Sequence, residues 1–495
     1  MAKAGSAEIG GVPEKARVLF DQRILPGRFL IASNRLPYAL SLEDGEVVFQ
    51  RGAGGLVTAL DPIIRATGGT WIGWTGSYDE LPEMVVLQQD VDTALEYQLK
   101  PLQLTRQEVE HYYLGHSNRG IWPLYHYFQE RAEFSREQWQ TYETVNRKFA
   151  DAIAAEYREG DLIWVHDYHL MLVPAMLREA LPDALIGFFL HIPFPSVEML
   201  QVDPHAEATL RGLLGADLVG FHIDRYARNF MDAVAALTNH RYRRNEMLVE
   251  AGTRAVKVGS FPISIDFKHF AEVAARPETE ARAQEIRHHY QAKTIALGVD
   301  RLDYTKGILE RLEAIELMLE KHKELQGNFT FIQISAPSRT KVHAYQQMRE
   351  GIEQMVGRIT GRFGGKGGAP VDYRYQGYPQ EDLVAFYRAA DLALVTPLRD
   401  GMNLVAKEYA ASRVDGDGAL VLSRFAGAYG ELRGAIAVNP YDIESMADSI
   451  YQAITLDPEE RRERMQRMRR TVSRNDIYWW LERFLREVAA VRSYA

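Results

Sequence analysis

The sequence predicts an α/β protein in which two doubly wound domains of comparable size face each other across a cleft. Its 495 residues are too many for one compact core. Short apolar runs alternate with helical patterns almost throughout, which predicts parallel sheets with helices on both faces. The runs form two series, separated by an extended, proline-interrupted segment at 257–267 that we expect to link the domains. Ligands of such domains bind beyond the carboxyl ends of the strands, so the cleft is the expected site.

Each series supplies the strands of one expected sheet. The first covers residues 29–33, 70–74, 161–165, 185–190 and 217–221. The second covers residues 294–299, 329–335, 371–376, 391–396, 419–423 and 435–438. Helical patterns with apolar residues at i, i+3 and i+4 lie between several of these runs, as in 308–323 after Gly307.

The ends of the chain complete the predicted organisation. Residues 1–28 form an extension, 29–260 the N-terminal domain and 261–475 the C-terminal domain. Asp457-Pro458 predicts a capped helix start, and a second cap follows at Asn475-Asp476. The last segment, 476–495, is rich in aromatic residues, and we expect it to pack as a helix on the N-terminal domain.

The composition excludes several kinds of partner. The formal net charge of −9, from 58 Lys and Arg against 67 Asp and Glu, argues against a nucleic-acid partner. The absence of cysteine fits a reducing compartment, and no apolar run approaches the ~18 residues that a membrane span needs. We therefore expect a cytoplasmic protein with small-molecule ligands and no membrane partner. A homo-oligomer is compatible with the sequence.

Cations follow the first strand of the second series, in the stretch VDRLDYTKG. Arg301 and Lys306 lie five residues apart in a loop that Gly307 closes before a helix. A strand-end loop with two cations and a following helix N-terminus suits a phosphate or a diphosphate. Taken alone, the pair is equally compatible with two solvated surface side chains.

Histidines and a carboxylate follow two strands of the first series. HDYHL contains His166, Asp167 and His169, and HIPFP puts His191 at the end of the next strand. The H-x-x-H spacing is a weak metal signal without other clustered ligands, so we expect no metal site. Asp167 suits a hydrogen bond to substrate hydroxyls instead, and a strand-end histidine such as His191 is either functional or structural.

Further candidates are spread along the chain. Arg35 ends the first strand in SNRLP, Gly54 and Gly55 precede a helix, and Arg339 follows a strand in APSR. Paired glycines let backbone N–H groups approach a phosphate. Tyr113 and Trp122 bracket YLGHSNRGIW, where their rings could stack on a sugar or simply pack in the core.

The stretch VTPLRDGMNLVAKEY carries more polar groups than a strand–loop–helix turn needs. Asp400 and Gly401 lie in the loop, with Arg399 and Asn403 beside them. Glu408 follows within the first helical turn, next to Lys407. Polar groups thus load the strand ends of both series, which a protein without a ligand has no reason to do.

In this order, the motifs SNR, GGL, W-x-G-W at Trp71–Trp74, HDYHL, GFFLHIPFP, RLDYTKG, APSR and PLRDGMNLVAKEY resemble those of the trehalose-6-phosphate synthase family of retaining glucosyltransferases. The resemblance covers nearly the whole chain. It implies the GT-B fold, with two facing Rossmann-like domains and a catalytic cleft between them. It also implies transfer of glucose from a nucleoside-diphosphate glucose to glucose 6-phosphate with retention of configuration, without a covalent enzyme intermediate and without a metal or other cofactor.

The resemblance assigns roles to individual residues. It implies catalytic roles for Asp167, His191, Arg301, Lys306 and Asp400. It implies a donor site made of Gly54, Gly55, His191, Arg301, Lys306, Asp400, Gly401, Met402, Asn403, Leu404 and Glu408, in which Arg301 and Lys306 hold the diphosphate and Glu408 takes the ribose. It implies an acceptor site made of Arg35, Trp74, Tyr113, Trp122, Asp167 and Arg339.

Some positions depart from the family pattern and leave alternatives open. Arg51-Gly52 stands where a small serine more often precedes the glycine pair, and His116 and Gly120 replace aromatic and aliphatic residues on the acceptor side. A glucosylglycerol-phosphate synthase, which uses glycerol 3-phosphate, is therefore the alternative enzyme, and a non-catalytic sugar-phosphate sensor is a remote one. The sequence leaves the base of the donor open between UDP-glucose and ADP-glucose.

Overall fold

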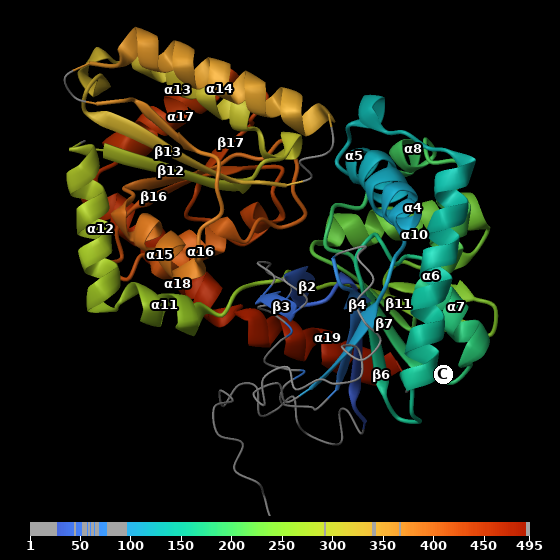
Figure 1. Ribbon diagram of the computed structural model, residues 1–495. Coiled ribbons are helices and arrows are strands. Elements are labelled where there is room, and N and C mark those ends of the chain that lie inside the picture. The colour runs from blue at the N-terminus through green and yellow to red at the C-terminus, as the bar shows by residue number, and fades with distance from the viewer. Residues whose placement is uncertain are drawn as a thin grey trace, which may run out of the picture. The chain divides into compact units, whose positions relative to one another are not determined.

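The computed structural model describes residues 27–43, 46–51, 57, 60, 64, 69–76, 97–291, 294–338, 343–365 and 368–491. The chain divides into two compact units (Figure 1). The first contains Met1–Phe261 together with Tyr478–Ala495, and the second contains Pro262–Ile477. The chain therefore passes between the units twice, after Phe261 and after Ile477.

The first unit contains a nine-stranded sheet in the order β5-β4-β1-β6-β7-β8-β11-β10-β9. Neighbours from β5 to β11 are parallel, and β10 and β9 complete one edge in antiparallel fashion. The strands are β1 (Phe29–Arg35), β4 (Thr70–Trp74), β5 (Gln98–Leu102), β6 (Leu162–His166), β7 (Leu185–Phe189), β8 (Leu218–Phe221), β9 (Arg241–Arg243), β10 (Leu248–Ala251) and β11 (Arg254–Ser260). A separate antiparallel pair is formed by β2 (Tyr38–Glu43) and β3 (Glu46–Arg51).

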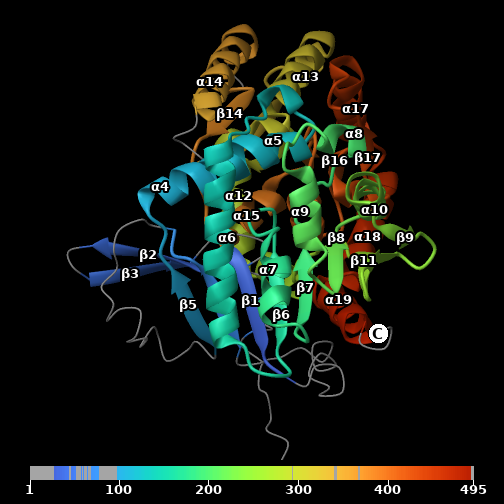
Figure 2. The same cartoon turned by 90° about the vertical axis from the view of Figure 1, so that its right-hand side faces the viewer.

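Helices cover this sheet, and Figure 2 shows α6, α7 and α9 in front of β1, β6 and β7. Its helical segments are α4 (Arg106–Glu108), η2 (Val109–Ile121), α5 (Trp122–Tyr125), η3 (Gln129–Arg131), α6 (Arg136–Glu156), α7 (Val173–Ala180), α8 (Val197–Leu200), α9 (Ala206–Leu213), α10 (Asp224–Thr238) and α19 (Ile477–Val491). The segment η2 is a π-helix of 13 residues, a rare conformation that is found most often near functional sites.

The aromatic C-terminal helix α19 packs on the sheet of the first unit. Phe484 stacks on Trp164 of β6, with ring centroids 4.4 Å apart. Gly187 and Gly220 lie under the same ring, where an added Cβ would come within 3.0 Å or less of Phe484. Trp480 donates from Nε1 to the carbonyl of Phe261 at 3.1 Å. The aromatic side chains thus bury the end of the chain against small residues of β7 and β8.

The second unit contains a six-stranded, fully parallel sheet in the order β14-β13-β12-β15-β16-β17. The strands are β12 (Thr294–Arg301), β13 (Phe329–Ala336), β14 (Val371–Arg374), β15 (Leu392–Val395), β16 (Ala419–Ser423) and β17 (Ile436–Val438). Because both faces of a parallel sheet are covered, its central strands are mostly buried, and β15 is apolar with no exposed position.

Figure 1 shows α13, α14 and α17 over one face of this sheet and α12, α15, α16 and α18 over the other. The helical segments are α11 (Phe267–Ala274), α12 (Pro277–Tyr290), η4 (Tyr304–Lys306), α13 (Ile308–Lys321), η5 (Lys323–Leu325), α14 (His343–Phe363), α15 (Gln380–Ala389), α16 (Val405–Ser412), η6 (Gly427–Gly430), α17 (Ile443–Thr455) and α18 (Pro458–Arg474). The apolar face of α13, with Leu312, Ile315 and Leu319, packs in one core with Phe331 of β13. Asp457 caps α18 as expected, accepting from the backbone N–H of Glu459 and Glu460.

All eleven expected strands form, which confirms the α/β class. The expectation missed β5, the β2–β3 pair and the strands β9 to β11 at the edge of the first sheet, where apolar runs are short or mixed with charges. One expectation is wrong in part: Lys257–Ser260 do not belong to a linker but form the second half of β11, paired with β8. Alternating burial in this strand, with Val256 and Val258 inside, hides it from a search for continuous apolar runs.

Candidate active site

In the second unit, Lys306 ends a short loop that buried groups hold in place. Asp303 is fully buried and accepts from the backbone N–H of Thr305 at 3.0 Å, which makes it the cap of η4. Gly307 follows at φ 64°, and an added Cβ would lie 2.4 Å from the carbonyl oxygen of Thr396. Only glycine fits there, so β12, the loop and α13 are joined in one conformation. Arg301, at the end of β12, is exposed.

A buried arginine that the sequence did not indicate hydrogen-bonds to this loop. Arg311 of α13 has no exposed surface and forms an ion pair with Asp300 at 2.7 Å. The same guanidinium donates to Thr396 Oγ1 at 2.9 Å and to the carbonyl of Lys306 at 3.2 Å. It therefore joins the ends of β12 and β15 to the lysine loop.

The predicted loop after β15 is folded around the carboxylate of Asp400. Its Oδ2 accepts from Lys306 Nζ at 2.5 Å, and its Oδ1 accepts from the backbone N–H of Met402 at 3.2 Å. Asn403 Nδ2 donates to Oδ2 at 3.2 Å, and Asn403 itself lies at φ 72°, a strained value for a residue with a side chain. Leu404 caps α16. Lysine and aspartate, predicted for different parts of one ligand, are thus paired with each other.

A second loop, Phe425–Ala428, hydrogen-bonds to the loop that carries Asp400. Asp400 donates its N–H to the carbonyl of Phe425 at 3.1 Å, and Ala428 donates to the carbonyl of Met402 at 2.8 Å. Gly427 lies so close that an added Cβ would be 2.1 Å from the carbonyl oxygen of Gly401. The sequence indicated Gly401, but it gave no sign that the loop Phe425–Ala428 packs against this glycine.

Glu408 lies on α16 beside a fully buried tyrosine. Tyr387 of α15 donates its hydroxyl to Glu408 Oε2 at 2.7 Å. Burial raises the pKa of Glu408, and the hydrogen bond from Tyr387 opposes that rise. The neighbouring Lys407 is 1% exposed and pairs with Glu431 at 2.6 Å, so it is a structural ion-pair partner. Arg399, at the start of the loop before α16, lies over the ring of Phe425.

In the first unit, Asp167 and His191 lie next to each other at the ends of β6 and β7. Asp167 Oδ1 accepts from the backbone N–H of His191 at 3.2 Å, and Asp167 adopts φ 74°. His191 Nε2 lies 3.1 Å from His166 Nδ1, and His222 Nε2 donates to the His191 carbonyl at 3.1 Å. Burial, together with the neighbouring His166 and His222, lowers the pKa of His191, which favours a neutral imidazole.

Three of the predicted acceptor residues form an aromatic–cationic cluster. The Arg35 guanidinium lies 4.9 Å from the ring centroid of Trp74 and 5.3 Å from that of Tyr113. The two rings meet edge to face at 5.5 Å. Arg35 is exposed, whereas Trp74 is 2% exposed, so the buried indole is a platform under an accessible cation.

Trp122 lies outside this cluster. It is 5% exposed and packs on His126 at 4.2 Å and on Tyr168 at 5.7 Å. Its ring packs on these neighbours, and its contact with the acceptor stays a prediction. Gly54, Gly55 and Arg339 are outside the described residues.

The described part of the chain contains no group of three or more His, Cys, Asp or Glu side chains arranged to hold a metal ion. His166, from the weak H-x-x-H signal, instead contacts His191, and His169 stacks on Tyr113 at 5.7 Å. None of the helices in the described residues is long and apolar enough to cross a membrane.

Comparisons with known proteins identify the family. The model of "Glycosyltransferase family 20" matches residues 27–490. The chain belongs to this family. A trehalose-6-phosphate synthase of Mycobacterium sp. (strain KMS) is 46% identical over 476 residues, 94% of this chain and 96% of the relative.

Solved structures of similar proteins extend the likeness to the fold. A UDP-forming alpha,alpha-trehalose-phosphate synthase from Burkholderia xenovorans, in complex with glucose-6-phosphate, matches with a TM-score of 0.85 and 35% identity, over 93% of this chain and all of that one. An E. coli structure bound with UDP-2-fluoro glucose matches equally, with a TM-score of 0.85 and 35% identity over 94% and 99%. The GT-B fold and the family implied by the sequence motifs are confirmed.

In this family 20 glycosyltransferase, most of the residues that the sequence did not indicate are buried residues that hydrogen-bond to the predicted site residues or to their loops. His166 stood in a quoted motif but was passed over for Asp167. Asp303 also stood in a quoted motif, RLDYTKG, without being selected, whereas Arg311 and Tyr387 lie outside every quoted motif and resemble ordinary helix residues. Their importance is visible only from their burial and hydrogen bonds.

Proposed function

We propose that this family 20 enzyme transfers glucose from UDP-glucose to glucose 6-phosphate, with retention at the anomeric carbon, to give trehalose 6-phosphate. The observation that carries the proposal is the 46% identity to a trehalose-6-phosphate synthase over 94% of the chain. The choice of UDP and of glucose 6-phosphate is supported by the solved relatives, one UDP-forming with glucose-6-phosphate and one with UDP-2-fluoro glucose.

Arg301 and Lys306 are the proposed cations for the departing diphosphate. Both follow β12, and the capped η4 and Gly307 fix the loop that carries Lys306. Preorganised positive charge at a developing anion is the strongest contribution that such a site can make. Lys306 is already paired with Asp400, so donor binding replaces this pair by contacts of Lys306 with phosphate and of Asp400 with a sugar hydroxyl.

The loop 400–404 and Glu408 are the proposed contacts of the rest of the donor. Gly401, Met402, Asn403 and Leu404 supply backbone N–H groups next to the start of α16, where the helix dipole favours an anion. A carboxylate such as that of Glu408 suits the ribose because it accepts from two hydroxyls.

In the first unit, the proposed acceptor site centres on Arg35. An accessible guanidinium over two aromatic rings suits a phosphorylated sugar, since the cation binds phosphate and the rings offer an apolar face. Asp167 and His191 are the proposed groups at the reacting sugar. His191, held neutral, can donate or accept one hydrogen bond without carrying charge. The acceptor hydroxyl then attacks on the face from which the diphosphate leaves, and orientation supplies much of the acceleration.

A donor-by-acceptor matrix tests the proposal. Purified enzyme is incubated with UDP-, ADP- or GDP-glucose and with glucose 6-phosphate, glycerol 3-phosphate or glucose, and product and released nucleotide are quantified. The expected product is trehalose 6-phosphate from UDP-glucose, with the α,α configuration by NMR. Preference for glycerol 3-phosphate, or binding without turnover across the matrix, would refute it. Parallel reactions with EDTA test the sequence-based expectation that no metal is needed.

A further inference from the structure

We propose that Tyr387 is a positioning residue for donor binding, which orients the carboxylate of Glu408 toward the ribose of the nucleotide. The inference rests on the proposed function in one respect, the assignment of Glu408 to the ribose. It adds a residue from a different helix, α15, that no sequence motif indicated.

The contact itself is specific to one carboxylate oxygen. The Tyr387 hydroxyl donates to Glu408 Oε2 at 2.7 Å, an ordinary length for a hydrogen bond between a hydroxyl and a carboxylate. Among the described residues, no other side chain hydrogen-bonds to this carboxylate. Tyr387 has no exposed surface, whereas Glu408 is half-buried. A donor fixed on Oε2 from the buried side leaves Oε1 as the oxygen for a ligand.

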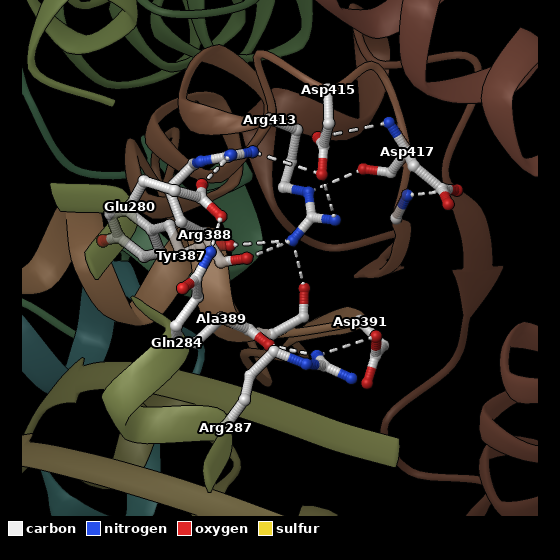
Figure 3. A network of polar contacts seen from close by, with 12 residues as sticks. Glu280, Gln284, Arg287, Tyr387, Arg388, Ala389, Asp391, Arg413, Asp415 and Asp417 are labelled. Carbon is white, nitrogen blue, oxygen red and sulfur yellow. Dashed lines mark hydrogen bonds and ion pairs between the residues drawn. The ribbon is translucent and has the colours of Figure 1, made fainter. Parts of the chain in front are cut away.

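The tyrosine is itself held rigidly, because the carboxyl end of α15 is capped by arginines. Arg413 Nη1 donates to the carbonyls of Tyr387 at 3.2 Å, Arg388 at 2.8 Å and Ala390 at 2.5 Å. Arg287 Nη1 donates to the next carbonyl, that of Ala389, at 2.6 Å. Figure 3 shows both guanidiniums directed at this helix end. Cations at the last carbonyls of a helix satisfy groups that have no partner within the helix.

Arg413 is in turn fixed by the loop that follows α16. Its Nη2 donates to Asp415 Oδ2 at 2.9 Å, and its Nε donates to the carbonyl of Asp417 at 2.6 Å (Figure 3). The carboxylate of Asp415 also pairs with Arg388, and that of Asp417 pairs with Arg461. The network connects the carboxyl ends of α15 and α16, the two helices that carry Tyr387 and Glu408.

The charge state of Glu408 gives the tyrosine a second effect. Burial raises the pKa of Glu408, and the hydroxyl of Tyr387 lowers it again by stabilising the carboxylate. Without the hydroxyl, the carboxylate is both free to rotate and easier to protonate. Ribose binding that needs the ionised form then weakens as the pH falls, and it starts to weaken at a higher pH than in the wild type.

The test compares Tyr387→Phe with Tyr409→Phe in the full-length enzyme. Each substitution removes one hydroxyl from a buried tyrosine, and the two rings are neighbours at 6.4 Å. Only the Tyr387 hydroxyl donates to the Glu408 carboxylate, since the Tyr409 hydroxyl donates to the carbonyl of Ala390 at 3.4 Å. The dissociation constant of UDP is measured by calorimetry, so that the result does not depend on turnover.

We expect Tyr387→Phe to weaken UDP binding about 10-fold, within the range for one hydrogen bond to a charged group. Tyr409→Phe should leave it within 2-fold. Two UDP analogues are also tested, one without the 2′-hydroxyl and one without the 3′-hydroxyl. At least one of these analogues should bind the wild type, Tyr387→Phe and Tyr409→Phe with the same affinity. The double variant Tyr387→Phe/Glu408→Gln should bind UDP no more weakly than Glu408→Gln alone, because both changes remove the same contact.

Each outcome is decisive. Equal UDP affinity of Tyr387→Phe and the wild type overturns the proposal. The proposal is also overturned if Tyr387→Phe binds both deoxy analogues more weakly than the wild type does, by the same factor as for UDP. Absence of UDP binding by the wild type also overturns it. If Tyr387→Phe does not fold, the wild type alone provides the test: the proposal is overturned if the wild type binds both deoxy analogues as tightly as UDP. Failure of glucose transfer with normal ribose-dependent UDP binding refutes the proposed function but supports this inference.

Discussion

The fully buried Arg311–Asp300 pair should be the most sensitive point of the second unit. Replacing Arg311 with methionine keeps an unbranched side chain but removes the guanidinium. Four hydrogen bonds are lost: to Asp300, to Gln333 Oε1, to Thr396 Oγ1 and to the carbonyl of Lys306. The remaining carboxylate of Asp300 is 2% exposed and keeps Gln333 Nε2, at 3.2 Å, as its partner.

The size of the effect follows from the buried charge that is left behind. Removing one member of a buried ion pair costs about 3–5 kcal/mol, mainly because the other charge stays desolvated. For a unit of roughly 200 residues, 1 kcal/mol corresponds to about 2–4 °C in Tm. We therefore expect Arg311→Met to lower the Tm of the Pro262–Ile477 unit by roughly 6–20 °C.

Two measurements and one matched control make the effect attributable. Calorimetry of the full chain gives the Tm, and hydrogen exchange in peptides covering β12, β15 and η4 locates the loosened region. The control is Arg358→Met on α14. Arg358 pairs with Glu316, but its side chain is 54% exposed. Glu316 is only 10% exposed, but it keeps Arg362 as a partner at 2.6 Å, so no buried charge is left unpaired and this variant should melt within a few degrees of the wild type.

A second variant tests the reasoning about the unpaired charge. In Arg311→Met/Asp300→Asn no buried charge remains, so part of the lost stability should return. An Arg311→Met variant that melts like Arg358→Met would refute the argument. So would a double variant that is less stable than Arg311→Met alone, since this would mean that the carboxylate is not the source of the instability.

Three further outcomes follow from other parts of the molecule. Arg301→Ala and Lys306→Ala should each lower turnover by about 10² or more, as expected for groups that stabilise a leaving anion, and near-normal turnover in both would remove them from that role. Gly307→Ala should destabilise the enzyme by about 2 kcal/mol or more in urea unfolding, given its φ of 64° and a Cβ 2.4 Å from a carbonyl oxygen, whereas Gly357→Ala, with open space around it, should be neutral or stabilising. Burial lowers the pKa of His116 to about 3, so between pH 6.5 and 3 the unfolded chain binds a proton that the folded chain does not, and stability falls as the pH falls. His116→Phe should therefore gain about 2–3 kcal/mol relative to the wild type on going from pH 7 to pH 4.5 in denaturant titrations, and parallel pH profiles would contradict this.

The strands and the loops after them could be predicted because their signals are local. A buried parallel strand such as β15 is a continuous apolar run, and the residues that follow it, Asp400 to Asn403, are too polar for a simple turn. The strand β11, which lies between β8 and β10, could not be recognised in the same way, because only alternate residues are buried. Its place beside β8 depends on pairing across a long stretch of chain.

The limits of the sequence are clearest at Trp122 and His166. Trp122 was grouped with Tyr113 because the two flank one motif. The structure places Tyr113 against Arg35 and Trp122 against His126 and Tyr168, an arrangement that spacing alone does not give. His166 precedes Asp167, which was selected. Its contact with His191 connects the ends of β6 and β7, and the spacing of residues within one motif cannot reveal such a contact. Periodicity describes one element at a time, and these relations exist between elements.

Arg311 and Tyr387 have a property in common that explains why the quoted motifs do not contain them. Each makes a hydrogen bond from a buried position to a predicted site residue, Arg311 to the carbonyl of Lys306 and Tyr387 to Glu408. Residues that meet a ligand come from loops, where polar clusters stand out in the sequence. Residues that hold them can come from any helix whose face turns inward, where one polar side chain among apolar ones resembles ordinary amphipathic variation. Since a catalytic group is useful only within a narrow range of positions, substitutions at these hidden supports should lower donor affinity or turnover without touching any substrate.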